Sequence, residues 1–166
     1  MPGLPDERPP GLDSPWTARI IKYGAKAQVK VFRLTNGRVG KYWRIGAGWK
    51  KPVPTLLLHH VGRKSGTAFT TPLLYLRDGE GPDADLVIVA SQGGLPKNPQ
   101  WFHNLMAAPD CEVSLPGRRR VPVHAHRADP AEKERLWPPL VDLYADFAKY
   151  AVWTDRDIPV VVLSPR

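Results

Sequence analysis

Six short runs of β-forming residues between residues 55 and 164 constrain the fold of this chain more than any other feature. Tight turn signals, such as Gly-Arg-Lys-Ser-Gly and Pro-Gly, separate several neighbouring runs. Strands joined by short turns pair antiparallel, because parallel pairing needs a long crossover connection. We therefore expect a small antiparallel barrel of about six strands. The runs are TLLLHHVG (55–62), AFTTPLLYLRD (68–78), DLVIVAS (85–91), CEVSLPG (111–117), RRVPVHAHRA (119–128) and IPVVVLS (158–164).

The N-terminal part of the chain predicts a basic helix at residues 15–36. Ser14 is a favourable N-cap, Pro15 suits the first helical position, and Asn36-Gly37 is a stop signal. One basic and one largely apolar set recur at helical spacing, so the helix either covers the core or lies on an anionic membrane or an acidic ligand. The sets are Arg19, Lys22, Lys26, Lys30 and Arg33, and Trp16, Ile20, Tyr23, Ala27, Val31 and Leu34.

Two further helices are expected, because Asn-Pro at 98–99 and Asp-Pro at 129–130 each pair a cap with a proline. The predicted fold class is therefore α+β. Residues 15–166 are numerous enough for one domain with its own core. The Pro-rich start at 1–14 has the composition of a disordered leader.

Charge and cysteine content exclude several classes of function. The net charge of +8 is concentrated in the first 50 residues, which hold ten Lys or Arg and three Asp or Glu. Outside one helix the basic residues lack interleaved aromatics, so we expect no nucleic-acid partner. A single cysteine, Cys111, excludes an internal disulfide and suits a reducing cytoplasm. His124 and His126 share a strand face without an evident third ligand, so we expect no metal.

The turn at 62–66 places Arg63, Lys64 and Ser65 between two glycines. It is not a P-loop, because the G-x-x-x-x-G-K-[ST] spacing is absent and a strand follows. Backbone N–H groups, a hydroxyl and a guanidinium could still converge there on an anion. A plain basic turn has the same pattern, so these residues alone leave both interpretations open.

Two other segments are candidate ligand sites. In VIVASQGGLPKNPQWFHN a buried strand ends at Ser91, two glycines follow, and a helix begins near Asn98. A helix N-terminus attracts anionic or carbonyl oxygens, although a well-capped loop would look the same. Tyr144, Phe147 and Tyr150 stand three residues apart in the last helix. They either fill the core or present a surface to a planar ligand.

Three segments together resemble the deazaflavin (coenzyme F420)-dependent nitroreductase family, over about residues 53–166. The motifs are G-R-K-S-G, A-S-x-G-G, K-N-P-x-W and W-T-D-R-x-I-P, in this order and at matching intervals. The resemblance implies a split β-barrel of the FMN-binding type. It also implies that the barrel binds coenzyme F420, an 8-hydroxy-5-deazaflavin that carries a phosphate and a poly-γ-glutamate tail.

By this resemblance, the turn holds the cofactor phosphate through Arg63, Lys64 and Ser65, and Gly66 permits the turn. The deazaflavin ring would lie against the strand that follows, and residues from two later segments would complete the pocket. The ring would be lined by Thr71, Pro72, Leu73 and Leu74, and the pocket completed by Ala90, Ser91, Gln92, Trp101 and Asn104.

The resemblance further implies a reductase that transfers a hydride from reduced F420 to an electron-poor small molecule: a quinone, an enone or a nitro compound. Tyr144, Phe147 and Tyr150 would form the substrate pocket. Family members often carry tyrosine at the position of Phe147 and lysine at that of Gln92. An FMN-dependent oxidoreductase and a non-catalytic deazaflavin-binding protein stay open as alternatives. Helix 15–36 would meet either the glutamate tail or the inner face of the plasma membrane, in an otherwise cytoplasmic protein.

Overall fold

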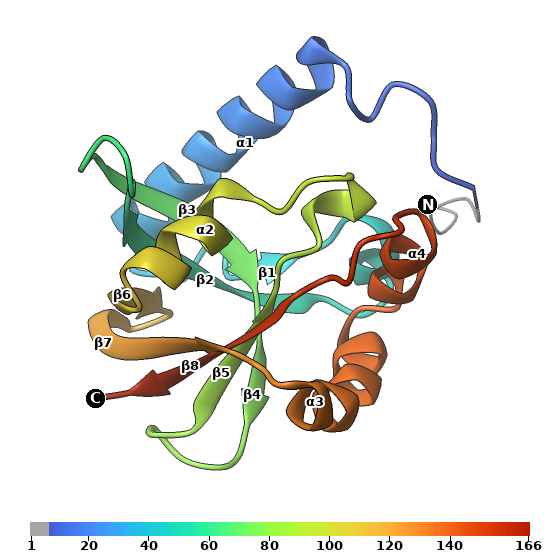
Figure 1. The fold of residues 1–166 in the computed structure, drawn as a ribbon. Coiled ribbons are helices and arrows are strands. Elements are labelled where there is room, and N and C mark those ends of the chain that lie inside the picture. The colour runs from blue at the N-terminus through green and yellow to red at the C-terminus, as the bar shows by residue number, and fades with distance from the viewer. Residues whose placement is uncertain (1–6) are drawn as a thin grey trace.

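The computed structural model describes residues 7–166 and is built around a curled antiparallel sheet (Figure 1). Within these residues the sheet has eight strands: β1 (Tyr42–Trp43), β2 (Val53–Val61), β3 (Ala68–Leu74), β4 (Leu76–Asp78), β5 (Asp85–Val89), β6 (Asp110–Leu115), β7 (Arg118–Arg127) and β8 (Val160–Pro165). Their spatial order is β1-β2-β6-β7-β8-β5-β4, and β3 pairs with β2 outside this path.

Every strand pairing in the sheet is antiparallel, as the short turns predict. In the β2–β3 hairpin Val61 pairs with Ala68, which puts the turn at 62–66 at the tip. The centre of the sheet is buried on both faces, and each face has its own cluster of core residues. Because successive side chains of a strand point to opposite sides, one strand contributes to both clusters. In β8, for example, Val161 packs into one core cluster and Val162 into the other.

Four α-helices and two 3₁₀ segments surround the sheet within residues 7–166. Helix α1 packs on β3, α2 packs on β2 and β7, and α3 contacts α4 and β4 (Figure 1). These elements are α1 (Pro15–Leu34), η1 (Gly46–Trp49), η2 (Gln92–Gly94), α2 (Gln100–Ala107), α3 (Pro130–Leu143) and α4 (Asp146–Val152).

The structure has two strands and one helix more than the sequence predicts. The run at 68–78 divides at Tyr75, because the chain changes partner there from β2 to β5. The short β1 lies in a segment where we expected only a Gly-rich link. The last predicted helix breaks at Tyr144, whose φ of −144° and ψ of 95° are extended rather than helical.

Helix α1 contacts the barrel through a different face from the one its apolar pattern suggested. Phe32 is its only fully buried residue. Trp16, Ile20 and Tyr23 are exposed, Trp16 by 72%. The predicted apolar set therefore does not cover the core. None of the helices in residues 7–166 combines the length and apolarity needed to cross a bilayer. Residues 1–6 of the predicted leader lie outside the described part of the chain.

Candidate active site

The turn at 62–66 is held by its own backbone. The N–H of Gly66 donates to the carbonyl of Gly62 (2.8 Å), and the N–H of Gly62 donates to the carbonyl of Thr67 (2.8 Å). Gly66 has a φ of +66°, which an L side chain rarely adopts. The Oγ of Ser65 accepts a hydrogen bond from the Thr67 N–H (3.2 Å). A Cβ at Gly62 would lie 2.6 Å from Oγ of Ser65, so both glycines suit the turn, which leaves Arg63 and Lys64 exposed at its tip.

Asn104 of α2 joins this turn to the interior. Its Oδ1 accepts hydrogen bonds from the backbone N–H of Arg63 (3.1 Å) and from the guanidinium of Arg63 (3.3 Å). Its Nδ2 donates to Nδ1 of His60 (3.1 Å). The other ring nitrogen, Nε2, then carries the proton and donates to Oγ1 of Thr71 (2.9 Å). A chain of four side chains therefore links three residues that the sequence selected: Arg63, Asn104 and Thr71.

His60 is the member of this chain that the sequence analysis missed. It is buried in β2, and burial lowers the pKa of its imidazole below the ordinary value, which keeps the ring neutral. The alternation of β2 places His60 on the same face as Leu56 and Leu58, two residues of the core cluster that also contains Val161, which we call the inner core cluster. That parity was readable from the sequence, but the partner Asn104 lies 44 residues away and was not.

Arg156 fixes the loop that follows β5. Its guanidinium donates to three carbonyls, those of Ala90 (3.1 Å), Ser91 (2.7 Å) and Leu95 (2.9 Å). It also donates to Oδ1 of Asn98 (2.6 Å). Burial lowers the pKa of Arg156, and these four acceptors compensate for the loss of water around its charge. The sequence analysis quoted this arginine within a motif but gave it no role.

The loop itself has an unusual backbone at η2. Ser91 is in the right-handed region, and Gln92, Gly93 and Gly94 follow with φ of 45°, 62° and 74°. Successive right- and left-handed residues form a nest, a concavity lined by backbone N–H groups that suits an anionic or carbonyl oxygen. Gln92 adopts positive φ without being glycine, which is a strained conformation typical of functional sites.

Gly94 brings this loop against α4. A Cβ at Gly94 would lie 3.1 Å from the Tyr150 carbonyl oxygen and 3.1 Å from Cβ of Trp153. The loop at 91–94 and the aromatic residues of α4 were separate candidates in the sequence. The structure packs them together, because only glycine leaves room for so close an approach.

The three aromatic residues predicted to form the substrate pocket differ in exposure. Tyr144 and Phe147 are buried, with 3% and 4% of their surfaces exposed, and their rings meet edge-on at 5.1 Å. Tyr150 is only partly buried, and its hydroxyl lies 3.4 Å from that of Tyr144. Burial raises the pKa of both tyrosines. Tyr144 and Phe147 therefore pack as core, and Tyr150 is the accessible member.

Several residues predicted to line the cofactor pocket are also structural. Ala90 and Trp101 are buried in the inner core cluster, where the Trp101 ring meets Phe102 edge-on at 6.4 Å. Leu73 packs against that cluster and Leu74 against the other. Thr71 and Pro72 are partly exposed; Thr71 belongs to the His60 network, whereas Pro72 pairs with Leu57 and points to the other face of the sheet.

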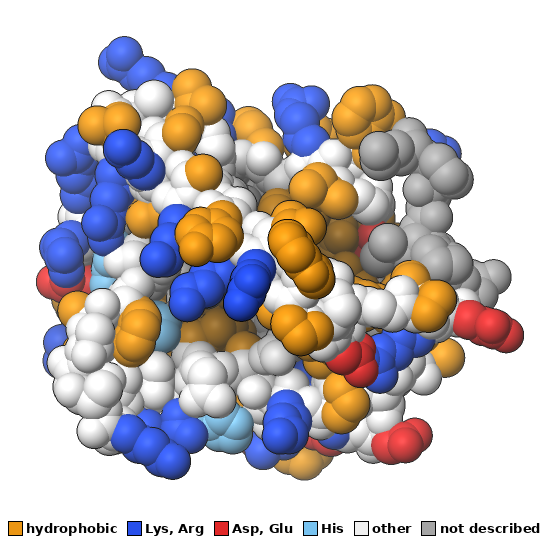
Figure 2. Space-filling view, turned by 90° about the horizontal axis from the view of Figure 1, so that it is seen from above, with side chains coloured by type: hydrophobic (Ala, Val, Ile, Leu, Met, Phe, Trp, Pro, Cys, Tyr) orange, Lys and Arg blue, Asp and Glu red, His pale blue; other side chains and the backbone are white. Residues whose placement is uncertain are grey.

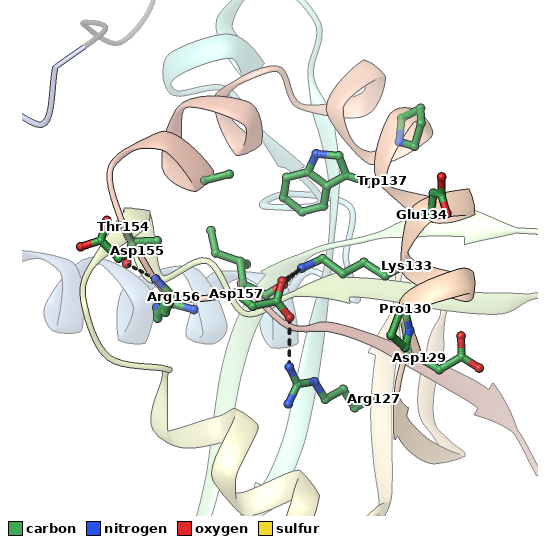
Figure 3. A pocket seen from close by; sticks show the side chains of 14 residues that line it. Arg127, Asp129, Pro130, Lys133, Glu134, Trp137, Thr154, Asp155, Arg156 and Asp157 are labelled. Carbon is green, nitrogen blue, oxygen red and sulfur yellow. Dashed lines mark hydrogen bonds and ion pairs between the residues drawn. The ribbon is translucent and has the colours of Figure 1, made fainter.

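Two hollows are visible on the surface. The face seen from above has an apolar hollow with Lys and Arg side chains gathered beside it (Figure 2). A separate open groove of about 1080 Å³ lies between α3 and the segment after α4. Its floor is an ion-pair cluster in which Asp157 accepts from Lys133 and from Arg127, the latter at 3.1 Å (Figure 3). Of the residues above, only Arg156 borders this groove, so the predicted site lies elsewhere.

The residues at the turn suit an anionic group. The Arg63 guanidinium bonds to the amide oxygens of Gln100 (2.9 Å) and Asn104, which are neutral and leave its charge uncompensated. Backbone, hydroxyl and guanidinium donors together match a phosphate. Within residues 7–166 no group of three or more His, Cys, Asp or Glu is placed to hold a metal ion.

The curled antiparallel sheet and its helices define a split-barrel oxidoreductase of the FMN-binding type. The chain belongs to the F420H(2)-dependent quinone reductase family, whose sequence profile matches residues 24–165. It is therefore an F420-dependent reductase, as the resemblance implied, and the expected cofactor, F420, is confirmed over the FMN alternative. The family is named for quinone reduction, and quinones are among the acceptors that the likeness to nitroreductases implied.

Individual relatives agree with this assignment. A Mycobacterium tuberculosis protein provisionally named an F420H(2)-dependent quinone reductase is 50% identical over 74% of this chain and 99% of that protein. A second protein from the same species, named an F420H(2)-dependent quinone reductase, is 41% identical over 82% of this chain and 86% of its own length. A solved F420-H2 dependent reductase superposes with a TM-score of 0.58 and 34% identity, over 67% of this chain and 94% of that one.

Proposed function

We propose that this chain binds reduced F420 with its phosphate at the turn 62–66 and reduces a quinone-type acceptor held near Tyr150. The observation that carries the proposal is the chain of hydrogen bonds from Arg63 through Asn104 and His60 to Thr71. It connects a phosphate-type turn to the strand residues assigned to the ring. The acceptor class comes from the names of the relatives.

Bound reduced F420 supplies the hydride, so the protein's own residues bind, orient and stabilise charge. Arg63, Lys64 and Ser65 offer the phosphate two cations and a hydroxyl. Asn104 holds the Arg63 backbone in place, which reduces the ordering that binding would otherwise require. Because the backbone of Arg63 is bonded to the buried Asn104, the turn would keep one geometry although it lies at the surface.

The loop at 91–94 is proposed to face the ring edge. Arg156 binds the Ala90 and Ser91 carbonyls, so the N–H groups of the same trans peptides, those of Ser91 and Gln92, point the opposite way, where they can stabilise developing negative charge. Gln92, at the position where relatives often have lysine, would contribute a neutral amide there. That difference predicts weaker attraction for anionic acceptors.

Tyr150 is proposed to donate a hydrogen bond to the acceptor. Burial raises its pKa further above neutral pH, so the hydroxyl stays protonated and acts as a hydrogen-bond donor, not as an acid. Phe147 has no hydroxyl and is buried, so it is proposed to shape the pocket wall from behind. Stabilisation of the acceptor oxygen would then depend on one tyrosine at the surface of the aromatic cluster.

Helix α1 is proposed to contact an anionic membrane surface, where a lipophilic quinone would be found. Trp16, Ile20 and Tyr23 are exposed apolar side chains, and Lys22 and Lys26 lie among them. An exposed set of aromatic, aliphatic and basic residues is typical of a helix that lies in a lipid interface. Co-sedimentation with anionic vesicles at low salt tests this, with neutral vesicles as the control. Equal binding to both kinds of vesicle, or to neither, would remove the proposal.

The experiment that tests the reductase assignment follows the absorbance of reduced F420 as menadione is added. We expect reoxidation that depends on both protein and menadione. F420 binding without any reoxidation by quinones, enones or nitro compounds would leave the non-catalytic binder as the correct alternative.

A further inference from the structure

A small polar cavity lies on the face of the β2–β3 hairpin opposite to the His60 network. It has a volume of about 270 Å³ and opens beneath the C-terminal end of α1. His59 and His60 are neighbours in β2, and their side chains point to opposite faces of the sheet. The polar residues that line the cavity are Arg33, Asn36, His59, Ser114, Arg119 and Arg120.

The cavity has an excess of positive charge. Arg120 pairs with the Glu112 carboxylate (2.6 Å). Within residues 7–166, Arg33 and Arg119 form no ion pair, and the oxygens that they bind are neutral. Arg33 donates to Oγ1 of Thr70 (2.7 Å), and Arg119 donates to Oδ1 of Asn36 (3.1 Å). Two guanidinium charges are therefore left without a carboxylate.

The floor of the cavity is a fixed row of hydrogen-bonding groups. His59 lies between two hydroxyls, with Nδ1 3.1 Å from Oγ1 of Thr70 and Nε2 2.8 Å from Oγ of Ser114. Burial, followed by the charges of Arg120 and Arg33, lowers the pKa of His59 to about 4. The ring is neutral at physiological pH and positions the two hydroxyls, while the local potential stays positive because of the arginines.

Backbone features hold the cavity in shape. Arg120 has a φ of 51°, and the β6–β7 pairing shifts register between Val113 and Leu115. Such a bulge redirects side chains, and positive φ in a residue with a side chain is a cost that functional sites tolerate. The end of α1 is fixed to the β6–β7 turn, since the Gly117 N–H donates to the Asn36 carbonyl (3.1 Å).

A tight approach supports the same junction. A Cβ at Gly37 would lie 2.6 Å from Cα of Pro116, so glycine is required there. Arg119 also reaches the Arg33 carbonyl from the other side (3.3 Å). Arg33, Arg119 and Arg120 therefore lie on two elements, α1 and β7, that are hydrogen-bonded to each other. This holds the three guanidinium groups near one another before a ligand binds, unlike independent surface cations.

We propose that this cavity binds an anionic oxygen group, a carboxylate or a phosphate, between Arg33 and Arg119 above the Ser114 hydroxyl. Planar guanidinium groups bind such oxygens in a bidentate manner. The cavity lies about 10 to 13 Å along the hairpin from the turn at 62–66, the length of three or four strand residues. Two sources share the required chemistry: the acidic tail of a cofactor bound at that turn, which rests on the proposed function, and a free phosphate.

Calorimetric titration at low ionic strength measures the affinity of the protein for two probes, inorganic phosphate and γ-linked triglutamate. Arg33→Gln and Arg119→Gln remove the charge and leave a shorter, neutral side chain that is still polar. Arg118→Gln is the matched control, because Arg118 is the next residue along β7, does not line the cavity and donates to the Pro82 carbonyl instead. Thermal midpoints are measured in parallel to verify that each variant is folded.

We expect at least one probe to bind saturably to the wild-type protein and to Arg118→Gln. Binding to each of the other two variants should be weaker by roughly 10- to 100-fold, the effect of one charge-assisted hydrogen-bond pair. The absence of saturable binding by both probes, or an equal loss in Arg118→Gln, overturns the proposal.

A second arm identifies the source by comparing F420 with a single glutamate and F420 with a long tail. Tighter binding of the long-tailed form that disappears in Arg119→Gln supports the tail. Equal binding of the two forms, together with retained phosphate binding, supports the free anion. If the single-glutamate form fails to bind at all, the proposed function at the turn is wrong, while the two probes still decide the cavity.

Discussion

Asn104 accepts two hydrogen bonds from Arg63 through a single oxygen, one from the backbone N–H and one from the guanidinium. The residues are 41 positions apart, and Asn104 is 96% buried in α2. A side chain from the core therefore sets the geometry of an exposed, basic turn. This relationship makes the turn a preorganised site rather than a solvated loop.

Asn104→Ala should both destabilise the fold and weaken F420 binding. The variant leaves the Arg63 N–H and Nδ1 of His60 without partners, which costs about 1 to 3 kcal/mol. Urea unfolding measures the stability and a fluorescence titration the affinity. Gln100→Ala is the matched control, because it removes an exposed partner of the same guanidinium and no buried one. Unchanged F420 affinity in Asn104→Ala would contradict a preorganised turn.

Stability should fall as the pH is lowered from 6.5 to 4. The pKa of His59 is about 4 in the folded state and 6.5 without its surroundings. Within this window the unfolded chain takes up a proton that the folded chain does not, so acid favours unfolding. The expected loss is about 1 to 2 kcal/mol, less than the full shift because the ring is only half-buried.

His59→Gln should flatten part of this pH dependence, measured by urea unfolding at pH 7 and pH 4.5. The remaining slope is assigned to His60, whose pKa is also lowered by burial, and near pH 4.5 to Asp78 and Asp157, whose pKa values are lowered by hydrogen bonds from Arg135 and Lys133. An identical slope in wild type and His59→Gln would show that His59 does not resist protonation in the folded state.

Tyr150→Phe should slow menadione reduction while F420 affinity stays close to that of the wild type. Loss of a hydroxyl that donates to developing negative charge costs about 1 to 3 kcal/mol in the barrier, or ~5- to 150-fold in turnover. Tyr144→Phe is the matched control, since its hydroxyl is buried and should affect turnover little. Equal effects of the two variants on turnover would reject Tyr150 as the donor.

Gly46→Ala should be far more destabilising than Gly81→Ala. Both glycines have positive φ, 60° and 81°. A Cβ at Gly46 would lie 2.3 Å from Oδ2 of Asp146 and 2.9 Å from the Tyr144 hydroxyl, whereas Gly81 has nothing within 4 Å. We expect about 1 kcal/mol for Gly81→Ala and about 3 kcal/mol or more for Gly46→Ala. Similar thermal midpoints for the two variants would mean that η1 and α4 are not closely packed.

Most strands and turns, and the caps of α1 and α3, were readable from local sequence. The expected cap of α2 was wrong: Pro99 is the N-cap, no side chain caps the helix, and Oδ1 of Asn98 accepts from Arg156 instead. Ser14 caps α1 as expected, with its Oγ accepting from the Thr17 N–H (3.2 Å), because N-cap chemistry depends on neighbours in the chain. The hairpin tip at 62–66 was found for the same reason. The division of the run at Tyr75 was not predicted, since a change of strand partner leaves no local signal.

The site was predictable only where a motif carried it. Arg63 and Asn104 were selected by family resemblance, and the structure joins them directly. His60 and Arg156 act through partners distant in sequence, so spacing could not reveal them. Helical spacing could not decide whether Tyr144 was core or pocket, because both uses produce the same pattern.

The central claim is that the turn at 62–66 grips the F420 phosphate, and an affinity comparison tests it most directly. Fluorescence titrations would measure F420 and a deazaflavin fragment without the phosphate, each against wild type, Arg63→Ala and the control Arg118→Ala. We predict low-micromolar or tighter F420 binding in wild type, on the order of −8 kcal/mol. Arg63→Ala should lose about 1.5 to 3 kcal/mol with F420 and much less with the fragment. Equal losses for F420 and the fragment, or none in Arg63→Ala, would contradict the account.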